Sequence, residues 1–462
     1  MRIDMGGHLP KEAVSWTATT STLFMLPLYK PVIQFYKPSP LNDMCMSRDV
    51  LRQSLIAVLS KCPLVFARVT AQPDRSLVLE YNPENSNNPV LEFHNATVSY
   101  ADLETRGFRL SDVSSNGLNM PVEDGMFTES FESPLLKFKV SFLSDGGIAL
   151  YSTRHHVLFD GNALFSFVSN WARCTRMLAQ NQVPIPPEMS LVQCLNKTGS
   201  PKPAEITVDT TQAFSGIVAA IKHAMDPNNM RSCVFSIAAS EIKRLKQQTM
   251  DSGLLLQGEW VSSNNVLTAF IAHHITRANM DACVYERGPW VVYNSLDMRR
   301  LLGLPLRGIG SPLFTVNCLV SYDELMDAKH IFQVAYRVRK CVERCTNGYL
   351  QDANDWIAAS YKELVKDGIQ EPWNHMSFTM LDSNARNLGV SCMDKIPVYD
   401  ADFGAGRPEM VRSLDNISNY VIALPSPQSD AYHLHVCLEG PAMDALMADP
   451  GWNSLCSLMC DS

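Results

Sequence analysis

A strand-to-helix junction around residue 156 constrains the fold of this chain more than any other feature. Residues 147–153 alternate apolar with small or polar side chains, the pattern of a half-buried strand. Residues 162–178 carry apolar side chains at helical spacing, namely Leu164, Phe167, Val168, Trp171 and Leu178. Between them lies Arg154-His155-His156-Val157-Leu158-Phe159-Asp160-Gly161. Junctions of this kind in α/β folds present reactive side chains to ligands, so we expect a site here.

The residue types at the junction indicate separate roles. A neutral imidazole can accept a proton near pH 7, which makes His156 the candidate general base. Asp160, on the turn, is expected to hold the loop through an ion pair or backbone hydrogen bonds without touching the imidazole. Gly161 would permit a turn or close packing. An isolated His and Asp at this spacing are more often a core histidine beside a helix N-cap.

Length and composition favour a large globular protein. The length of 462 residues predicts two domains or more, and the content of 46% hydrophobic and 19% charged residues excludes a disordered chain. The net charge of −8, without a block of basic residues interleaved with aromatics, makes nucleic acid an unexpected partner.

The cysteines and the early apolar stretch indicate a cytoplasmic protein. The thirteen cysteines are scattered and show no metal-ligand spacing, so we expect thiols in a reducing compartment and no metal. Residues 1–10 lack the apolar run of a signal peptide. The apolar stretch 23–35 contains two prolines and a lysine, and it is too broken to span a membrane.

A second motif lies far downstream, in Tyr399-Asp400-Ala401-Asp402-Phe403-Gly404-Ala405-Gly406-Arg407-Pro408. The HHxxxDG junction and this Asp-Phe-Gly segment, in this order, resemble the two signatures of the HxxxD acyltransferases, the BAHD superfamily. Ala405 stands where that family carries an aromatic residue. The resemblance is closest to fungal members that acetylate secondary metabolites, such as trichothecene 3-O-acetyltransferases.

The resemblance implies an α/β fold of two similar-sized domains like those of chloramphenicol acetyltransferase, with a channel between them. We expect an N-terminal domain at 1–200, a Pro-rich crossover linker at 201–230 and a C-terminal domain with the Asp-Phe-Gly motif at 231–462. The implied reaction is transfer of an acyl group from acyl-CoA, with acetyl-CoA the expected donor, to a hydroxyl or amine of a fungal secondary metabolite. His156 would act as general base without a covalent acyl-enzyme, in a monomer with no permanently bound cofactor.

The resemblance also implies roles for residues outside the junction. Arg299, in the Asp-Met-Arg-Arg segment after the strand expected at 289–296, would pair with Asp160 across the domain junction; a solvated charge cluster is the alternative. Asp402 and Gly404 would support the site structurally. The Gly161 N–H and Ser263 are candidate oxyanion donors. The candidates for binding the CoA phosphates are Lys243, Lys246, Arg299 and Arg300.

Two other functions remain open. Condensation domains of nonribosomal peptide synthetases share HHxxxDG in a chain of similar length but take acyl groups from carrier proteins. A non-catalytic relative that kept the fold is the third possibility.

Outside the motifs, the pattern predicts helices at 47–62, 239–249, 266–280, 323–344 and 442–447, and a short strand at 376–380. His273 and His274 are adjacent on a predicted helix and therefore point in different directions, so they are expected to be structural or surface residues.

Overall fold

The computed structural model describes residues 2–17, 29–71, 77–120, 133–192, 230–350, 352, 355, 386–415, 417–428 and 430–461. The chain divides into two compact units. Unit 1 comprises residues 1–196, 298–313 and 395–415, and unit 2 comprises residues 197–297, 314–394 and 416–462. Two segments from the C-terminal half therefore belong to the unit that contains the HHxxxDG junction.

Unit 1 is built on a five-stranded sheet of order β14-β2-β7-β6-β5, with two small sheets, β1-β4-β3 and β11-β8. Its strands are β1 (Val14–Thr17), β2 (Tyr29–Tyr36), β3 (Arg68–Ala71), β4 (Leu77–Tyr81), β5 (Val90–Asn95), β6 (Leu136–Phe142), β7 (Ile148–His155), β8 (Ser190–Leu191), β11 (Gly308–Ile309) and β14 (Met410–Ser413). Its helices are α2 (Asn42–Cys45), α3 (Arg48–Leu59), α4 (Tyr100–Thr105), α5 (Leu110–Ser115) and α6 (Gly161–Ala179), with 3₁₀ turns η1 (Gly6–His8), η2 (Pro63–Phe66) and η3 (Pro83–Asn85).

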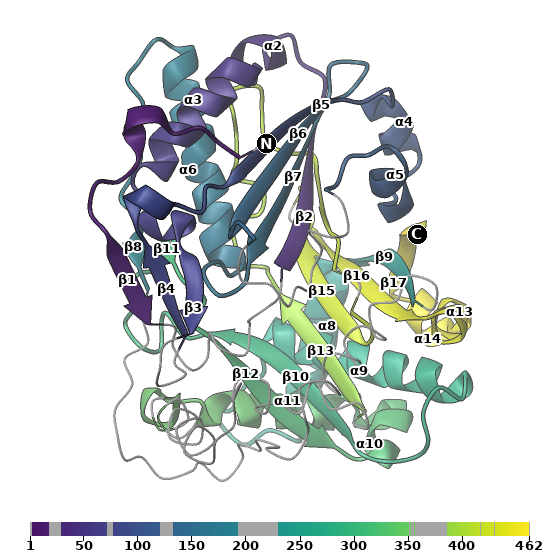
Figure 1. Cartoon of the computed structure of the whole chain (residues 1–462). Helices are drawn as coiled ribbons and strands as arrows, with labels where there is room; N and C mark the ends of the chain where they lie inside the picture. Colours follow the sequence, from purple (N-terminus) through teal and green to yellow (C-terminus); the bar gives the residue numbers. More distant parts are fainter. Residues whose placement is uncertain are drawn as a thin grey trace. The chain divides into compact units, whose positions relative to one another are not determined.

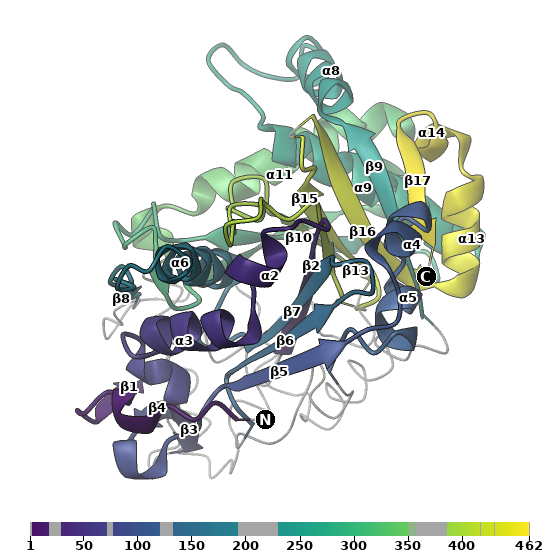
Figure 2. The same cartoon turned by 90° about the horizontal axis from the view of Figure 1, so that it is seen from above.

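The five-stranded sheet is covered on both faces, as Figures 1 and 2 show, with α3 and α6 on one side and α4 and α5 on the other. Alternation along the strands supplies both faces. Phe138 of β6 packs against Phe167 and Trp171 of α6. Phe35 of β2 packs against Phe108, which follows α4. β7, which carries the junction, is consequently buried along its whole length.

Unit 2 is built on a seven-stranded mixed sheet of order β12-β10-β13-β15-β16-β9-β17. The strands are β9 (Met230–Ala238), β10 (Trp290–Asp297), β12 (Leu313–Val320), β13 (Asn387–Cys392), β15 (Tyr420–Pro425), β16 (Ala431–Glu439) and β17 (Cys456–Asp461). The helices are α8 (Ala239–Met250), α9 (Ser263–Asp281), α10 (Tyr322–Met326), α11 (Ile331–Arg344), α13 (Gly440–Ala448) and α14 (Pro450–Asn453), with the 3₁₀ turn η5 (Ala328–His330).

Helix α9 is the centre of the unit 2 core and contacts α8, α10, α11 and α13. It is buried along most of its length, so few of its positions remain polar and exposed. His273 Nδ1 donates to the Leu325 carbonyl at 2.7 Å, and His274 Nδ1 lies 2.7 Å from the Asp449 carboxylate. Both histidines are structural, as expected, but they are buried rather than on the surface.

The sequence-based prediction of one helix over 323–344 is wrong. The segment is divided into α10, η5 and α11, because Asp327 is extended and its side chain accepts a hydrogen bond from the Lys329 N–H. An Asp side chain competes for backbone donors in this way and starts a new helical segment. Helix α9 begins at Ser263, three residues before the predicted start, because Ser262 is its N-cap. The strand predicted at 376–380 and most of the predicted linker lie outside the described residues.

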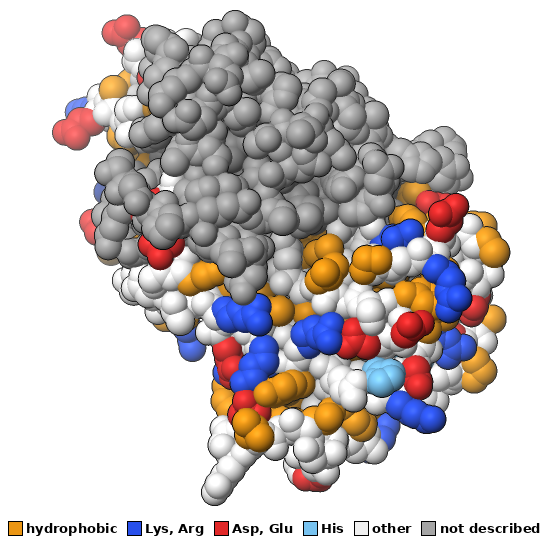
Figure 3. Space-filling model, turned by 90° about the horizontal axis from the view of Figure 1, so that it is seen from below, with side chains coloured by type: hydrophobic (Ala, Val, Ile, Leu, Met, Phe, Trp, Pro, Cys, Tyr) orange, Lys and Arg blue, Asp and Glu red, His pale blue; other side chains and the backbone are white. Residues whose placement is uncertain are grey.

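The distribution of surface charge and the state of the cysteines can be compared with the expectations from composition. Figure 3 shows one face on which basic, acidic and apolar side chains are interspersed rather than gathered into one basic block. No disulfide links the cysteines within the described ranges. Over the same ranges, no helix is both long enough and apolar enough to cross a membrane.

Candidate functional site

His156 follows the last residue of β7, in the middle of the five-stranded sheet of unit 1. β7 pairs with β2 on one side and with β6 on the other, both antiparallel. His156 is 8% exposed, and its Nδ1 lies 3.1 Å from the hydroxyl oxygen of Ser311, which is 2% exposed. The imidazole therefore lies at the end of β7 and contacts Ser311, a residue of the segment 298–313.

The surroundings of His156 keep its imidazole neutral. Burial, the charge of Arg154 and the charge of Lys30 together lower the pKa of His156 well below its usual value. Both cations are buried, and Lys30 of β2 lies opposite Arg154 of β7 in the register of the two strands. Desolvation and like charge both disfavour imidazolium, so at neutral pH the ring carries one proton and one lone pair.

The neighbouring His155 differs from His156 in its contacts, which are made to the turn after β7 and to Tyr29. Its Nδ1 accepts a hydrogen bond from the Val157 N–H at 3.3 Å, and its ring packs edge-on against Tyr29 with centroids 4.9 Å apart. Burial lowers the pKa of His155 to about 3. This histidine stabilises the turn after β7.

Asp160 is the N-cap of α6 and accepts a hydrogen bond from the Ala163 N–H at 2.8 Å. The predicted pair with Arg299 is present: Nη2 lies 3.1 Å from Oδ1, and Nη1 binds Oδ2. Asp160 is 2% and Arg299 0% exposed. Such a bidentate pair fixes the turn after His156, because separating the two side chains would leave a buried charge without its counterion.

The pair differs in one respect from the expectation. Arg299 belongs to the segment 298–313 and hence to unit 1, so the contact is made within one unit rather than across a domain junction. The same segment contributes β11, which pairs in parallel with β8, and Arg299 also donates to the Gly310 carbonyl at 3.1 Å. The segment reaches the HHxxxDG motif at both Asp160 and His156.

Gly161 is buried and opens α6 as a helical residue, rather than forming a separate turn. The N–H groups of a first helical turn have no intrahelical acceptor. A backbone donor at this position is therefore chemically suited to bind a developing negative charge, although its role stays a prediction.

The Asp-Phe-Gly loop is in unit 1 and packs against α6, instead of lying in the expected continuous C-terminal domain. Asp402 Oδ1 accepts hydrogen bonds from the Gly404 N–H at 2.7 Å and the Gly406 N–H at 3.1 Å. The Asp402 carbonyl accepts from Arg176 of α6. The buried Phe403 ring meets Trp171 edge-on, with centroids 5.2 Å apart. The loop is thus anchored to α6, the helix that Asp160 caps.

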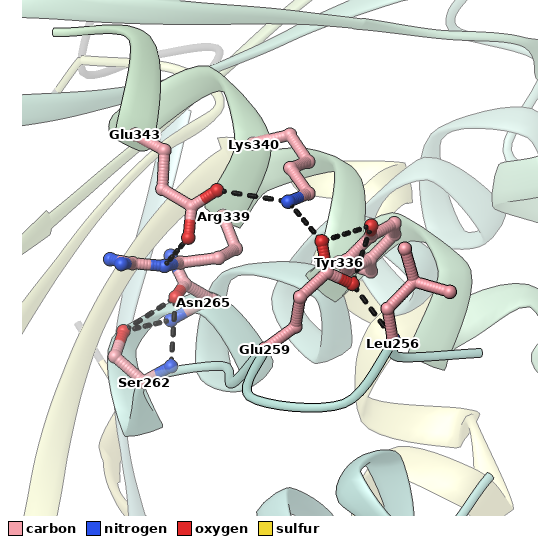
Figure 4. A network of polar contacts seen from close by, with 8 residues as sticks. All are labelled: Leu256, Glu259, Ser262, Asn265, Tyr336, Arg339, Lys340 and Glu343. Atoms are coloured by element: carbon pink, nitrogen blue, oxygen red, sulfur yellow. Dashed lines mark hydrogen bonds and ion pairs between the residues drawn. The ribbon is translucent and has the colours of Figure 1, made fainter. Parts of the chain in front are cut away.

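Ser263 lies in unit 2, as the first residue of α9. The preceding segment is tethered to α11 by a network drawn in Figure 4, in which Glu259 accepts from Tyr336 and Lys340. Ser262 and Asn265 form a capping box at the start of the helix. The position of Ser263 within unit 2 is therefore well defined.

The four candidate cations for the CoA phosphates differ in exposure. Arg299 is completely buried against Asp160, which removes it from this role. Lys243 and Arg300 are exposed and Lys246 is half-buried. Within the part of the chain that the structure describes, no cluster of three or more His, Cys, Asp or Glu side chains could hold a metal ion.

Sequence reasoning missed Ser311 and Gly310. They follow the short strand β11 and carry no local motif, because their contacts with the HHxxxDG junction are made to residues more than a hundred positions earlier. The signal available in the sequence was the Asp-Met-Arg-Arg segment, which identified Arg299 but not the residues after it.

Comparisons of this chain with a family model, with curated proteins and with solved structures all find transferases. The model of the Transferase family matches residues 18–451. Hydroxycinnamoyltransferase 2 of Oryza sativa subsp. japonica is 25% identical over 61% of this chain and 60% of its own length, so the chain spans less than two thirds of that relative. The O-acetyltransferase anaAT of Neosartorya fischeri is 23% identical over 79% of this chain and 82% of its own length. Among solved structures, TRI101 of F. sporotrichioides, complexed with coenzyme A and T-2, has a TM-score of 0.73 at 16% identity and covers 96% of this chain and all of its own.

Proposed function

This chain is an acyltransferase of the Transferase (BAHD) family, and on that premise we propose that it transfers an acyl group from acyl-CoA to a hydroxyl or amine, with His156 as general base. The observation that carries the proposal is the buried, neutral imidazole of His156 beside a turn fixed by Asp160 and Arg299. A general base must be unprotonated and held in place before the acceptor arrives.

The proposed reaction needs no covalent acyl-enzyme. The imidazole takes the proton of the acceptor O–H or N–H as the oxygen or nitrogen attacks the thioester carbonyl carbon. The C–S bond then breaks, and the imidazolium returns the proton to the departing CoA thiolate. The proposed donor to the oxyanion is the backbone N–H of Gly161 or, as the alternative, the hydroxyl of Ser263.

The buried cations Lys30 and Arg154 are consistent with the second half of this sequence. They disfavour the imidazolium of His156, so a proton taken from the acceptor is readily released again. A carboxylate in contact with the ring would have the opposite effect. In the described structure Asp160 binds Arg299 and the start of α6.

The proposed acyl donor is acetyl-CoA and the proposed acceptor an alcohol or amine of fungal secondary metabolism. Support comes from the similarity to an O-acetyltransferase of Neosartorya fischeri and from the fold shared with TRI101, whose complex contains coenzyme A and T-2. The proposal includes a monomeric cytoplasmic enzyme, an expectation that rests on the sequence.

Calorimetric titration of the purified chain with CoA and acetyl-CoA tests the proposal without knowledge of the acceptor. Saturable one-to-one binding is expected, followed by acceptor-dependent release of the CoA thiol with a panel of alcohols and amines. Absence of binding at millimolar ligand would contradict use of free acyl-CoA and favour the carrier-dependent condensation reaction. Binding without release for any acceptor would favour the non-catalytic relative.

A further inference from the structure

His156 contacts Ser311 through one of its two imidazole nitrogens. His156 Nδ1 and Ser311 Oγ are 3.1 Å apart, and both side chains are buried. A neutral imidazole carries its proton on one nitrogen and its lone pair on the other, and the partner of the first nitrogen selects the tautomer.

Two arrangements fit this distance, and they have opposite consequences. If the Ser311 O–H donates to Nδ1, the proton of the ring is on Nε2, and Nε2 has no lone pair for the acceptor. If Nδ1–H donates to Ser311 Oγ, the lone pair is on Nε2. Since Nδ1 is occupied by Ser311 in either case, Nε2 is the nitrogen left to act on a substrate.

We propose that Ser311 is a positioning residue, whose hydroxyl oxygen accepts the Nδ1–H of His156 and keeps the Nε2 lone pair available as the base. The inference deepens the proposed function and rests on it for the catalytic role of His156. The tautomer itself is a property of the resting protein and can be measured without turnover.

The backbone around Ser311 is fixed tightly enough for this role. The Gly310 carbonyl accepts from Arg299 Nη2 at 3.1 Å and from the Asp160 N–H at 3.5 Å. A Cβ at Gly310, where φ is +143°, would lie 2.7 Å from the Val192 carbonyl oxygen. On the other side, the Ser311 carbonyl accepts from the Leu313 N–H at 2.9 Å. The hydroxyl is therefore presented to His156 from a rigid segment.

A serine is chemically suited to this position for a second reason. A hydroxyl can accept Nδ1–H while carrying no charge, so it orients the ring without stabilising imidazolium as a carboxylate would. The imidazolium formed during transfer then stays acidic enough to protonate the leaving thiolate. Asp160 and Ser311 consequently have different roles. The Asp160 carboxylate fixes the turn after His156, and the Ser311 hydroxyl orients the His156 imidazole.

The test uses nitrogen NMR of the full chain labelled at its imidazoles. The chain has 11 histidines, so the His156 signals are assigned by their loss in a His156→Gln variant. At pH 7.5 the wild-type spectrum is expected to show a protonated Nδ1 and an unprotonated Nε2 for His156. In Ser311→Ala this population is expected to become mixed, and Ser311→Thr, which retains a hydroxyl, should restore it.

Kinetics provides the second readout. Ser311→Ala is expected to lower kcat on the order of 10²-fold through loss of orientation, with an unchanged KM for acetyl-CoA, and Ser311→Thr should recover most of the loss. A wild-type His156 that carries its proton on Nε2 would overturn the inference even if no variant folds. An unchanged tautomer in folded Ser311→Ala would also overturn it. Full activity of His156→Ala would instead refute the proposed function and leave the tautomer result standing.

Discussion

The guanidinium of Arg299 binds the carboxylate of Asp160 through two hydrogen bonds, and neither side chain is accessible to solvent. The two residues are 139 positions apart in the sequence. Since Asp160 also caps α6, the pair connects the segment 298–313 to the start of the helix that follows His156. The pair fixes the backbone on one side of the proposed base, and Ser311 contacts the base itself.

Asp160→Asn should destabilise the protein by about 3 to 5 kcal/mol, because it leaves the Arg299 charge buried without its counterion. Asparagine is also a good N-cap, so the change tests the ion pair rather than the cap. Chemical denaturation measures the free energy of unfolding.

Asp49→Asn is the matched control for this change. Asp49 lies in the first turn of α3, two residues after its N-cap, and pairs with Arg52 at 3.5 Å, but its side chain is 82% exposed. Its loss should cost no more than about 1 kcal/mol. Equal effects of the two substitutions would show that burial of the Asp160–Arg299 pair has no energetic consequence.

Gly404→Ala should destabilise the Asp-Phe-Gly loop by about 1 to 3 kcal/mol, because φ at this position is +112°. A Cβ there would also lie 2.8 Å from Cys45 Sγ. Gly406→Ala has nearly the same φ, +114°, with nothing within 4 Å of the added Cβ, so it isolates backbone strain from the clash. Gly404→Ala should have a lower free energy of unfolding than Gly406→Ala. Cys45→Ala should reduce this difference, because it removes the Sγ but leaves the Cys45 Cβ at 3.2 Å from the added Cβ. Equal stability of the two glycine variants would contradict the clash.

The Glu259–Lys340 contact should make stability depend on acid pH. The hydrogen bond with Lys340, followed by those with Leu256 and Tyr336, lowers the pKa of Glu259 to about 2. In the unfolded chain this pKa is about 4.3, so the stabilisation is complete above that pH and is lost as pH falls toward 2. A double-mutant cycle with Glu259→Gln and Lys340→Met, measured by unfolding at several pH values, should show a coupling that disappears over this interval. A coupling energy that stays the same down to pH 2 would exclude the depressed pKa of Glu259.

The lowered pKa of His156 has a kinetic consequence. Its imidazole stays neutral and able to accept a proton until pH falls below a value well under the usual 6.5 or so. The kcat/KM for acetyl-CoA should therefore show no loss between pH 7.5 and pH 6 that belongs to this group. A pH–rate profile measures it, and an acidic limb at or above pH 6.5 that vanishes in a His156 variant would contradict the account.

Local patterns predicted most of the secondary structure around the site. The strand before His156 and the helix after Asp160 are confirmed, because each is set by side-chain periodicity within a few positions. The error at Asp327 has a local cause as well. Its side chain binds the backbone two residues later, and apolar periodicity carries no information about such a bond.

The assignment of segments to the two units could not be read from periodicity. Residues 298–313 and 395–415 belong to unit 1 through contacts such as Arg299 with Asp160 and the pairing of β14 with β2. These contacts join residues far apart in the chain and leave no regular pattern. The resemblance to a family supplied Arg299, Asp402 and Gly404, whereas Ser311 became visible only in the three-dimensional structure.

The rate of acceptor-dependent CoA release by His156→Ala, compared with wild type at saturating acetyl-CoA, tests whether His156 is the general base. We expect a kcat lowered by roughly 10²- to 10⁴-fold, with unchanged calorimetric binding of acetyl-CoA and an unchanged unfolding transition, because the imidazole acts in the proton transfer rather than in binding. Release at the wild-type rate by this folded, acetyl-CoA-binding variant would contradict His156 as the general base.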